Sequence, residues 1–234
     1  MIRLTALAIA TSLLGVSAAP IALADKTGAT SAITEPFDRQ AALHDLAAVA
    51  VQRTVEKLGH PDGFYLTPAF HIRLPAKLEG AVKTLAADHA SSLSTALELS
   101  LNRCAEALVR PAADYALKTL PTVTFADPER LMQGTPDAVT LALEKSIGPG
   151  FRKTISEMVP ASAARADAPG ALRRMQTRYE DITDTAFPDI DLNGYILESF
   201  TTAFFASLAK EEQDMRLRPS ARSTDLLRRL FSKN

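Results

Sequence analysis

The stretch SSLSTALELSLNRCAEALVRPAADYALKTL, residues 91–120, carries the longest helical pattern in the chain. One apolar stripe runs along it at three- and four-residue steps and consists of Leu93, Leu97, Leu101, Cys104 and Leu108. This spacing places the side chains on one face of an α-helix. Pro111 is expected to kink or restart the helix, and Pro121 to close it. The stretch therefore predicts a long amphipathic helix with one buried face.

The segments on either side show the same helical periodicity. Asp38 can cap a helix whose apolar residues recur until Gly59 and Pro61 end it. Further helical patterns are expected over residues 77–87, 128–134, 135–147, 151–159 and 171–187. Between two of them, Gly148-Pro149-Gly150 is expected to break the helix.

The C-terminal part contains two more helical patterns. Asp191 or Asn193 can cap the first, and Arg218-Pro219-Ser220 separates it from the last. No stretch alternates apolar and polar residues for long enough to indicate a strand. The chain is therefore predicted to be all-α, a single-domain multi-helix bundle over residues 37–234 with one irregular loop segment.

The N-terminus has the features of a secretory signal. Arg3 precedes an apolar run, and Ala22-Leu23-Ala24 is typical of a cleavage site, so we expect a signal peptide over residues 1–24 with the cut after Ala24. Residues 25–36 are small and polar and are expected to form a flexible leader. These features predict a periplasmic or secreted protein.

Composition excludes some classes of protein. Cys104 is the single cysteine, so no internal disulfide can form in an oxidising compartment. The net charge of −1 lacks the basic surplus that a general nucleic-acid binder needs. We therefore expect a fold held by its apolar core and no nucleic-acid partner.

Residues 59–75 (GHPDGFYLTPAFHIRLP) interrupt the helical patterns with helix breakers, aromatic rings and charges. Pro68 and Pro75 restrict any strand in this segment, so an irregular, extended loop is predicted. Asp62 before Gly63 is typical of a tight turn, in which the carboxylate bonds backbone amides.

Four residues of this loop are candidate ligand-binding residues, namely His60, Asp62, Phe64 and Tyr65. A paired His and Asp could serve acid/base chemistry or hold a metal, but no His-x-x-x-His, Cys/His cluster or nucleophile motif accompanies them. A structural use is favoured, with Asp62 in a turn and the aromatic rings anchored to the bundle. No catalytic residue, metal ligand or cofactor is predicted.

A polar row lies beside the apolar stripe of residues 91–120. Glu98, Asn102 and Glu106 are four residues apart, Arg103 can reach Glu106, and Arg110 extends the row by one step. In one interpretation, the first four line a cleft that binds an anionic or hydrogen-bonding ligand. In the other, which spacing alone favours, they form a solvated helix face whose pairs contribute about 0.2–0.5 kcal/mol each.

Several blocks resemble one family, in the family's order. The run Gly59-His60-Pro61-Asp62-Gly63-Phe64 is similar to a Gly-x-Pro-Asp-Gly-Phe signature, and residues 98–106 (ELSLNRCAE) to a Ser-Met-Asn-Arg-Ala-Ala-Glu helix. Further blocks of this kind are residues 131–140 (LMQGTPDAVT), 191–196 (DLNGYI), 211–212 (EE) and 218–231 (RPSARSTDLLRRLF). Over nearly the whole mature chain, the sequence resembles the uncharacterised bacterial domain-of-unknown-function family 4197 (DUF4197).

One block departs from the family pattern. The family has an aromatic residue and an arginine after its Ala-Ala-Thr, whereas residues 141–144 here are LALE. The resemblance implies no catalytic residue, substrate or cofactor.

The last helical pattern surrounds an apolar face with Arg222, Arg228 and Arg229, which are candidates for contact with a membrane or a partner. A basic amphipathic helix of this kind can lie on an anionic membrane surface. A terminal helix that docks its apolar face on the domain has the same pattern. Docking is favoured, because Asp225 and Arg218-Pro219 are typical of capping and packing.

The leading functional hypothesis is a non-enzymatic, exported protein that binds an apolar or amphipathic ligand, or an envelope partner, between the long helix and the loop of residues 59–75. One alternative is an enzyme of unrecognised type that uses Asp62, Glu98, Arg103 or Glu106. Another is a peripheral membrane protein that acts through its C-terminal helix.

Overall fold

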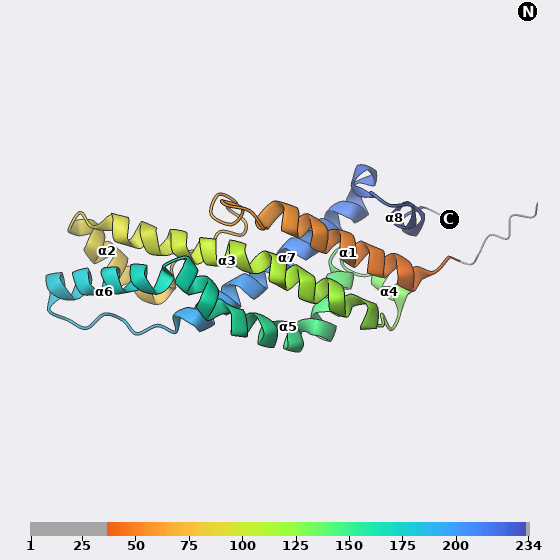
Figure 1. The fold of residues 1–234 in the computed structure, drawn as a ribbon. Helices are drawn as coiled ribbons and strands as arrows, with labels where there is room; N and C mark the ends of the chain where they lie inside the picture. The colour runs from red at the N-terminus through yellow and green to blue at the C-terminus, as the bar shows by residue number, and fades with distance from the viewer. Residues whose placement is uncertain (1–36, 233–234) are drawn as a thin grey trace, which may run out of the picture. The chain divides into compact units, whose positions relative to one another are not determined.

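The computed structural model describes residues 37–232, which form eight α-helices and three short 3-10 turns (Figure 1). The helices are α1 (Arg39–Leu58), α2 (Glu79–Ala87), α3 (Ser91–Thr119), α4 (Pro128–Gln133), α5 (Ala138–Arg165), α6 (Ala168–Thr183), α7 (Leu192–Leu217) and α8 (Asp225–Leu230). The 3-10 turns are η1 (Ala76–Leu78), η2 (Leu120–Thr122) and η3 (Pro219–Ala221). Residues 37–232 contain no strand, so the all-α prediction is confirmed. The predicted signal peptide (1–24) and leader (25–36) lie outside the described residues.

Local signals placed several helix ends correctly. The Asp38 side chain accepts a hydrogen bond from the backbone N–H of Ala41, and α1 ends at Gly59 as predicted. Asp127 caps α4 in the same way, and Asp191, the first of the two predicted candidates, caps α7. Each cap satisfies an N–H group that the first turn of a helix leaves without a partner.

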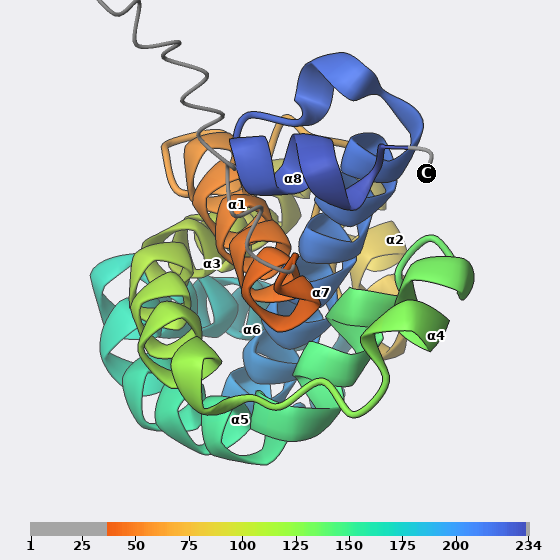
Figure 2. The ribbon, with the colours of Figure 1, turned by 90° about the vertical axis from the view of Figure 1, so that its right-hand side faces the viewer.

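The long helices pack around α7. This helix contacts α1, α3 and α5, and both ribbon views place it beside α1 and α5 (Figures 1 and 2). Phe200, Phe204 and Phe205 of α7 form a buried aromatic cluster with Phe151 of α5, whose ring centroid lies 5.2 Å from that of Phe204 and 5.0 Å from that of Phe205. Burying such a side chain contributes about 1.5–3 kcal/mol.

The apolar stripe of α3 faces this core. Leu97, Leu101, Cys104 and Leu108 are fully buried, and Leu93 is partly buried. Pro111 does not restart the helix, because α3 runs as one element from Ser91 to Thr119. The predicted amphipathic helix with one buried face is confirmed.

The break predicted at Gly148-Pro149-Gly150 is wrong. Helix α5 continues through this tripeptide, and through Pro160 as well, from Ala138 to Arg165. A proline removes one helical hydrogen bond, and burial of a long apolar face can compensate for that loss. Gly150 has a packing role here, because a Cβ at this position would lie 2.1 Å from the Tyr115 hydroxyl oxygen of α3. The glycine therefore leaves room for the Tyr115 side chain of α3 against α5.

The C-terminal segment packs on the rest of the fold. The Thr224 side chain caps α8 by accepting a hydrogen bond from the Leu227 N–H (3.1 Å), and its hydroxyl donates to Asp45 of α1. Leu227 is fully buried. Helix α8 therefore docks its apolar face on the domain. Within residues 37–232, no helix combines the length and the apolar character needed to cross a membrane.

Candidate functional site

The loop of residues 59–75 folds against α3 through tight turns. Asp62 adopts a positive φ of 70°. At Gly63, a Cβ would lie 2.7 Å from the Leu58 carbonyl oxygen, so the chain can turn back here only with glycine. Phe64 is fully buried, and its ring centroid lies 6.2 Å from that of Phe200 on α7. Phe64 thus anchors the first half of the loop in the core.

Glu106 of α3 binds the backbone of the loop. Its Oε1 accepts hydrogen bonds from the N–H groups of Phe64 (3.1 Å) and Tyr65 (3.4 Å). Its Oε2 accepts a bond from Arg103 (2.8 Å), whose other terminal nitrogen donates to Asp62 (2.6 Å). We call this group, namely Glu106, Arg103, Asp62 and the two N–H groups, the Glu106 clamp.

The charges of the Glu106 clamp compensate one another. Glu106 is only 6% exposed, and a buried carboxylate is stable when donors and an opposite charge surround it. Hydrogen bonding to Glu106, and to a smaller extent to Asp62, raises the pKa of Arg103 above its ordinary value. The guanidinium therefore stays charged at every physiological pH.

Asn102 binds the second half of the loop as a β-strand partner would. Its Oδ1 accepts a hydrogen bond from the Ile72 N–H (2.9 Å), and its Nδ2 donates to the Ile72 carbonyl (2.8 Å) and to the Glu98 carbonyl (2.8 Å). Asn102 is fully buried and Ile72 is 4% exposed. The asparagine thereby satisfies backbone groups that the extended loop would otherwise bury without partners.

His71 connects the loop to Glu98, another member of the polar row. Its Nδ1 faces the Tyr65 carbonyl oxygen (2.7 Å), and its Nε2 faces Glu98 Oε1 (2.6 Å). Both neighbours are acceptors when Glu98 is ionised, so the ring donates to both only when it carries two protons. The sequence left a His–Asp pair open and favoured an Asp62 carboxylate that bonds backbone amides in its turn. The structure instead pairs Asp62 with Arg103 and His71 with Glu98.

The structure thus brings most of the candidate residues together, and Glu106 and Asn102 bind the backbone of the loop. The solvated-face interpretation is wrong for Asn102 and Glu106, which are buried. The hydrogen bonds of the row residues are made to the loop and to each other. His60 lies apart, exposed, with its Nδ1 2.8 Å from the Pro61 carbonyl oxygen. The assignment of the loop and row residues as ligand-binding residues stays a prediction.

A groove with a volume of about 490 Å³ lies between α1 and α3, beside the start of the loop. Its lining residues are Gln52, Val55, Glu56, Gly59, His60, Arg110, Ala113, Asp114 and Leu117. Arg110 is the row residue that follows Glu106 by one helical step. Within residues 37–232, none of Gln52, Glu56, Arg110 and Asp114 makes a side-chain hydrogen bond or ion pair. We call this feature the α1–α3 groove.

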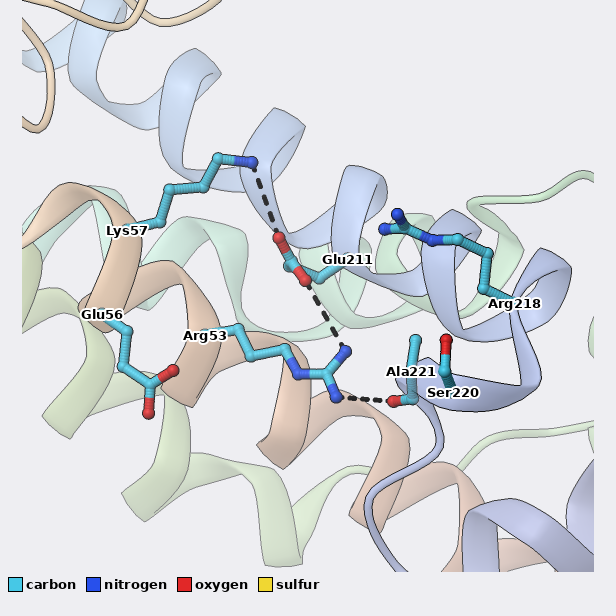
Figure 3. Close-up of a pocket in the computed structure, with 7 residues that line it drawn as sticks. All are labelled: Arg53, Glu56, Lys57, Glu211, Arg218, Ser220 and Ala221. Carbon is cyan, nitrogen blue, oxygen red and sulfur yellow. Dashed lines mark hydrogen bonds and ion pairs between the residues drawn. The ribbon is translucent and has the colours of Figure 1, made fainter.

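A second hollow, of about 510 Å³, lies between α1 and the C-terminal end of α7 (Figure 3). It is lined by Arg53, Glu56, Lys57, Glu211, Arg218, Ser220 and Ala221. Glu211 lies between two cations, with Oε1 3.6 Å from Lys57 Nζ and Oε2 3.8 Å from a terminal nitrogen of Arg53. We call this feature the α1–α7 hollow.

Comparison with known families matches residues 34–232 to the family described as "Protein of unknown function (DUF4197)". The chain belongs to this family. The match covers nearly the whole sequence, so the resemblance inferred from the short blocks is confirmed. No curated protein and no solved structure matches the chain.

A second clamp in this DUF4197 chain joins two of the blocks that carried the resemblance. Glu212 of α7 accepts hydrogen bonds from the N–H groups of Val139 (3.1 Å) and Thr140 (2.7 Å) at the start of α5, and from the Thr140 hydroxyl (2.8 Å). Arg216 donates to Glu212 (2.7 Å) and to the carbonyls of Leu131 (2.9 Å) and Met132 (2.8 Å). We call Glu212, Arg216 and these partners the Glu212 clamp.

Both blocks are visible in the sequence, but nothing in it connects them. Residues 131–140 and 211–212 stood out in the DUF4197 pattern, and Glu212 with Arg216 has the spacing of a helical ion pair. That spacing is common on exposed helix faces, so it did not indicate that Glu212 would be fully buried at the N-terminus of another helix. A negative charge is favoured at that position.

The C-terminal arginines of the DUF4197 chain have partners in the fold. Arg222 donates to the carbonyls of Met215 (3.0 Å) and Arg216 (3.1 Å), and its guanidinium carbon lies 4.9 Å from the Phe231 ring centroid. Arg228 pairs with Asp225 (2.8 Å), and the Arg229 guanidinium carbon lies 4.9 Å from the Phe37 ring centroid.

Within residues 37–232, no three His, Cys, Asp or Glu side chains come together in an arrangement that could hold a metal ion.

Proposed function

We propose that the protein is an exported binding protein that holds a small amphipathic ligand in the α1–α3 groove and does no chemistry on it. The observation that carries the proposal is the set of uncommitted polar side chains around an apolar wall. Val55, Ala113 and Leu117 supply apolar surface, while Arg110 and Asp114 are open to a ligand. Small-molecule sites combine an apolar lining with a few such groups, in volumes of roughly 300–1,000 Å³.

The charges of the groove restrict the polar end of the ligand. Arg110 is one cation, and Glu56 and Asp114 are two carboxylates in the same lining. A purely anionic head group would meet two like charges, and a purely cationic one would meet Arg110. A neutral or zwitterionic head group suits this lining best, with the apolar part of the ligand against Val55 and Leu117.

The groove lies where the loop leaves α1, at Gly59 and His60. The loop itself is tied to α3 by Glu106 and Asn102. In this proposal the clamped loop keeps one end of the groove rigid, and His60 is the loop residue that contacts the ligand. A rigid wall lowers the entropy cost of binding.

Export is the part of the proposal that rests on the sequence of residues 1–24 alone. If the signal is used, the protein recovered from a bacterial periplasm starts at Asp25. Its intact mass tests this directly, and a periplasmic protein that retains residues 1–24 would contradict it.

The test of binding is native mass spectrometry of the periplasmic protein, with mild activation to release a companion molecule. We expect a reproducible additional mass of a lipid-like or otherwise amphipathic compound. Arg110→Ala should lose it, whereas Lys118→Ala, which removes an exposed cation from the same helix outside the groove, should keep it. A ligand-free mass for the wild type, with an envelope protein recovered by affinity capture, would replace this proposal with a partner-binding role.

A further inference from the structure

The α1–α7 hollow contains a carboxylate whose surroundings differ from those of the other buried acids. Glu211 is 9% exposed, and its two ion pairs, at 3.6 and 3.8 Å, are longer than hydrogen bonds. No residue in 37–232 donates a hydrogen bond to it, whereas Glu106 and Glu212 each accept at least three. A nearly buried carboxylate at the wall of a hollow therefore keeps its acceptor capacity for a ligand.

Three cations of the hollow, Arg53, Lys57 and Arg218, supply donors and make further contacts of their own. Arg53 donates to the Ala221 carbonyl (2.5 Å), which orients its guanidinium beside Glu211. The Lys57 ammonium lies 5.4 Å from the Phe70 ring centroid. Arg218 pairs with Asp214 and reaches into the hollow with its side chain 62% exposed (Figure 3). Donor-only cations and the acceptor-only carboxylate of Glu211 thus face the same space, and Glu56 is a second carboxylate in the lining.

This combination selects among ligand groups by charge. The three cations Arg53, Lys57 and Arg218 are balanced by Glu56, Glu211 and the Asp214 that pairs with Arg218. An anion entering between the cations would approach Glu211, and a cation approaching Glu211 would meet Arg53 and Lys57. Neither charge gains a clear advantage.

A hydroxyl group fits both sides. It donates one hydrogen bond and accepts two, so it can donate to Glu211 while it accepts from Lys57 or Arg53. Several adjacent hydroxyls could use Arg218 and the Ser220 side chain in the same way. The volume of about 510 Å³ lies within the range of small-molecule sites.

We propose that the α1–α7 hollow is a binding site for the vicinal hydroxyls of a neutral saccharide, with Glu211 as acceptor and Arg53, Lys57 and Arg218 as donors. It is separate from the amphipathic-ligand function proposed for the α1–α3 groove, so either can fail alone. A free sugar and the end of a polysaccharide offer the same hydroxyl chemistry.

Saturation-transfer NMR on the full folded protein tests the site, with maltose and N,N′-diacetylchitobiose as neutral probes and glucosamine and glucose 6-phosphate as charged ones. We expect saturation transfer to at least one neutral probe and weaker binding of both charged probes. Titration of amylose then distinguishes the sources, because tighter binding than maltose supports a polysaccharide and equal binding supports a free sugar.

Two variants connect the signal to the hollow. Arg218→Ala should weaken saccharide binding about tenfold, the effect of losing one charge-assisted hydrogen bond, and its exposed position leaves the fold intact. Glu211→Gln should weaken it similarly, while Glu79→Gln, which removes an exposed carboxylate on α2, should bind as the wild type does. The absence of saturation transfer to both neutral disaccharides at millimolar concentration would overturn the proposal. Wild-type saccharide binding by Arg218→Ala and by a folded Glu211→Gln variant would overturn it as well.

Discussion

The Glu106 clamp and the Glu212 clamp have the same design at different depths. In each, a glutamate on a long helix accepts hydrogen bonds from two successive backbone N–H groups and from an arginine on its own helix. Arg103 keeps 33% of its side chain exposed and Arg216 only 11%. Glu106 and Glu212 are 6% and 0% exposed.

From this difference we expect the Glu106 clamp to open locally and the Glu212 clamp to open only with global unfolding. Water can hydrate Arg103 and Asp62 if the loop leaves α3, so local opening there costs less than global unfolding. Arg216 and Glu212 hold α4, α5 and α7 together inside the fold, and their charges would remain buried if one partner were lost. We expect mutations to reveal this order.

Glu212→Ala should have the largest effect. It removes the counter-charge of the buried Arg216 and leaves the Val139 and Thr140 N–H groups without an acceptor, which costs about 3–5 kcal/mol of unfolding free energy. Urea denaturation followed by circular dichroism measures it. Glu212→Gln, which keeps one acceptor oxygen, should lose less. A loss for Glu212→Ala smaller than that for Glu106→Ala would reverse the comparison.

Glu106→Ala should cost about 2–3 kcal/mol, because two backbone N–H groups lose their acceptor while Arg103 regains water. Hydrogen exchange should accelerate at Phe64 and Tyr65 and stay unchanged at Val139 and Thr140. Exchange that accelerates equally at both clamps would mean that the loop cannot open by itself.

Asn102→Ala should cost about 1–2 kcal/mol, since the Ile72 N–H and carbonyl lose their partners. Amide exchange at Ile72 reports the change. Asn102→Asp retains an acceptor for the N–H but removes the donor to the carbonyl and buries a charge, so we expect it to be no more stable than Asn102→Ala. Recovery of wild-type stability by Asn102→Asp would contradict the strand-like pairing.

The smallest effect is expected for the reaction of native Cys104 with a thiol reagent. Burial raises the pKa of its thiol to about 12, so almost no thiolate exists in the folded protein at neutral or mildly alkaline pH. The native protein should not react with a thiol reagent at about pH 8, whereas the urea-unfolded chain should react fully. Because Cys104 lies on α3 between Arg103 and Glu106, its labelling rate also separates local loop opening, which leaves it protected, from unfolding of α3.

Much of the fold could be predicted because its signals are local. The Asp38, Asp127 and Asp191 caps act within one helical turn, and the apolar stripe of α3 is visible in its spacing. The continuation of α5 through Gly148-Pro149-Gly150 could not be predicted, because the packing of α5 against other helices, including Tyr115 against Gly150, leaves no signal in the tripeptide itself. Local propensity favoured a break, and tertiary packing overrode it.

The sequence predicted which residues form the candidate site, but it did not predict which partners they bind. The row of Glu98, Asn102, Arg103 and Glu106 stood out by spacing, but a spacing of four residues is the same on a solvated face and on a buried one. The α1–α7 hollow was not predicted, because residues 211–212 stood out only as a family block and Arg53 and Lys57 lie far from Glu211 in the sequence.

The sequence by itself determined the helical class, most helix ends and the family, because periodicity, caps and short motifs lie within a few residues of each other. Only the tertiary structure decided which acids are satisfied and which keep their acceptor capacity. Glu106, Glu211 and Glu212 are the same residue type on amphipathic helices, and their roles differ because the packing brings backbone amides to two of them and only distant cations to the third.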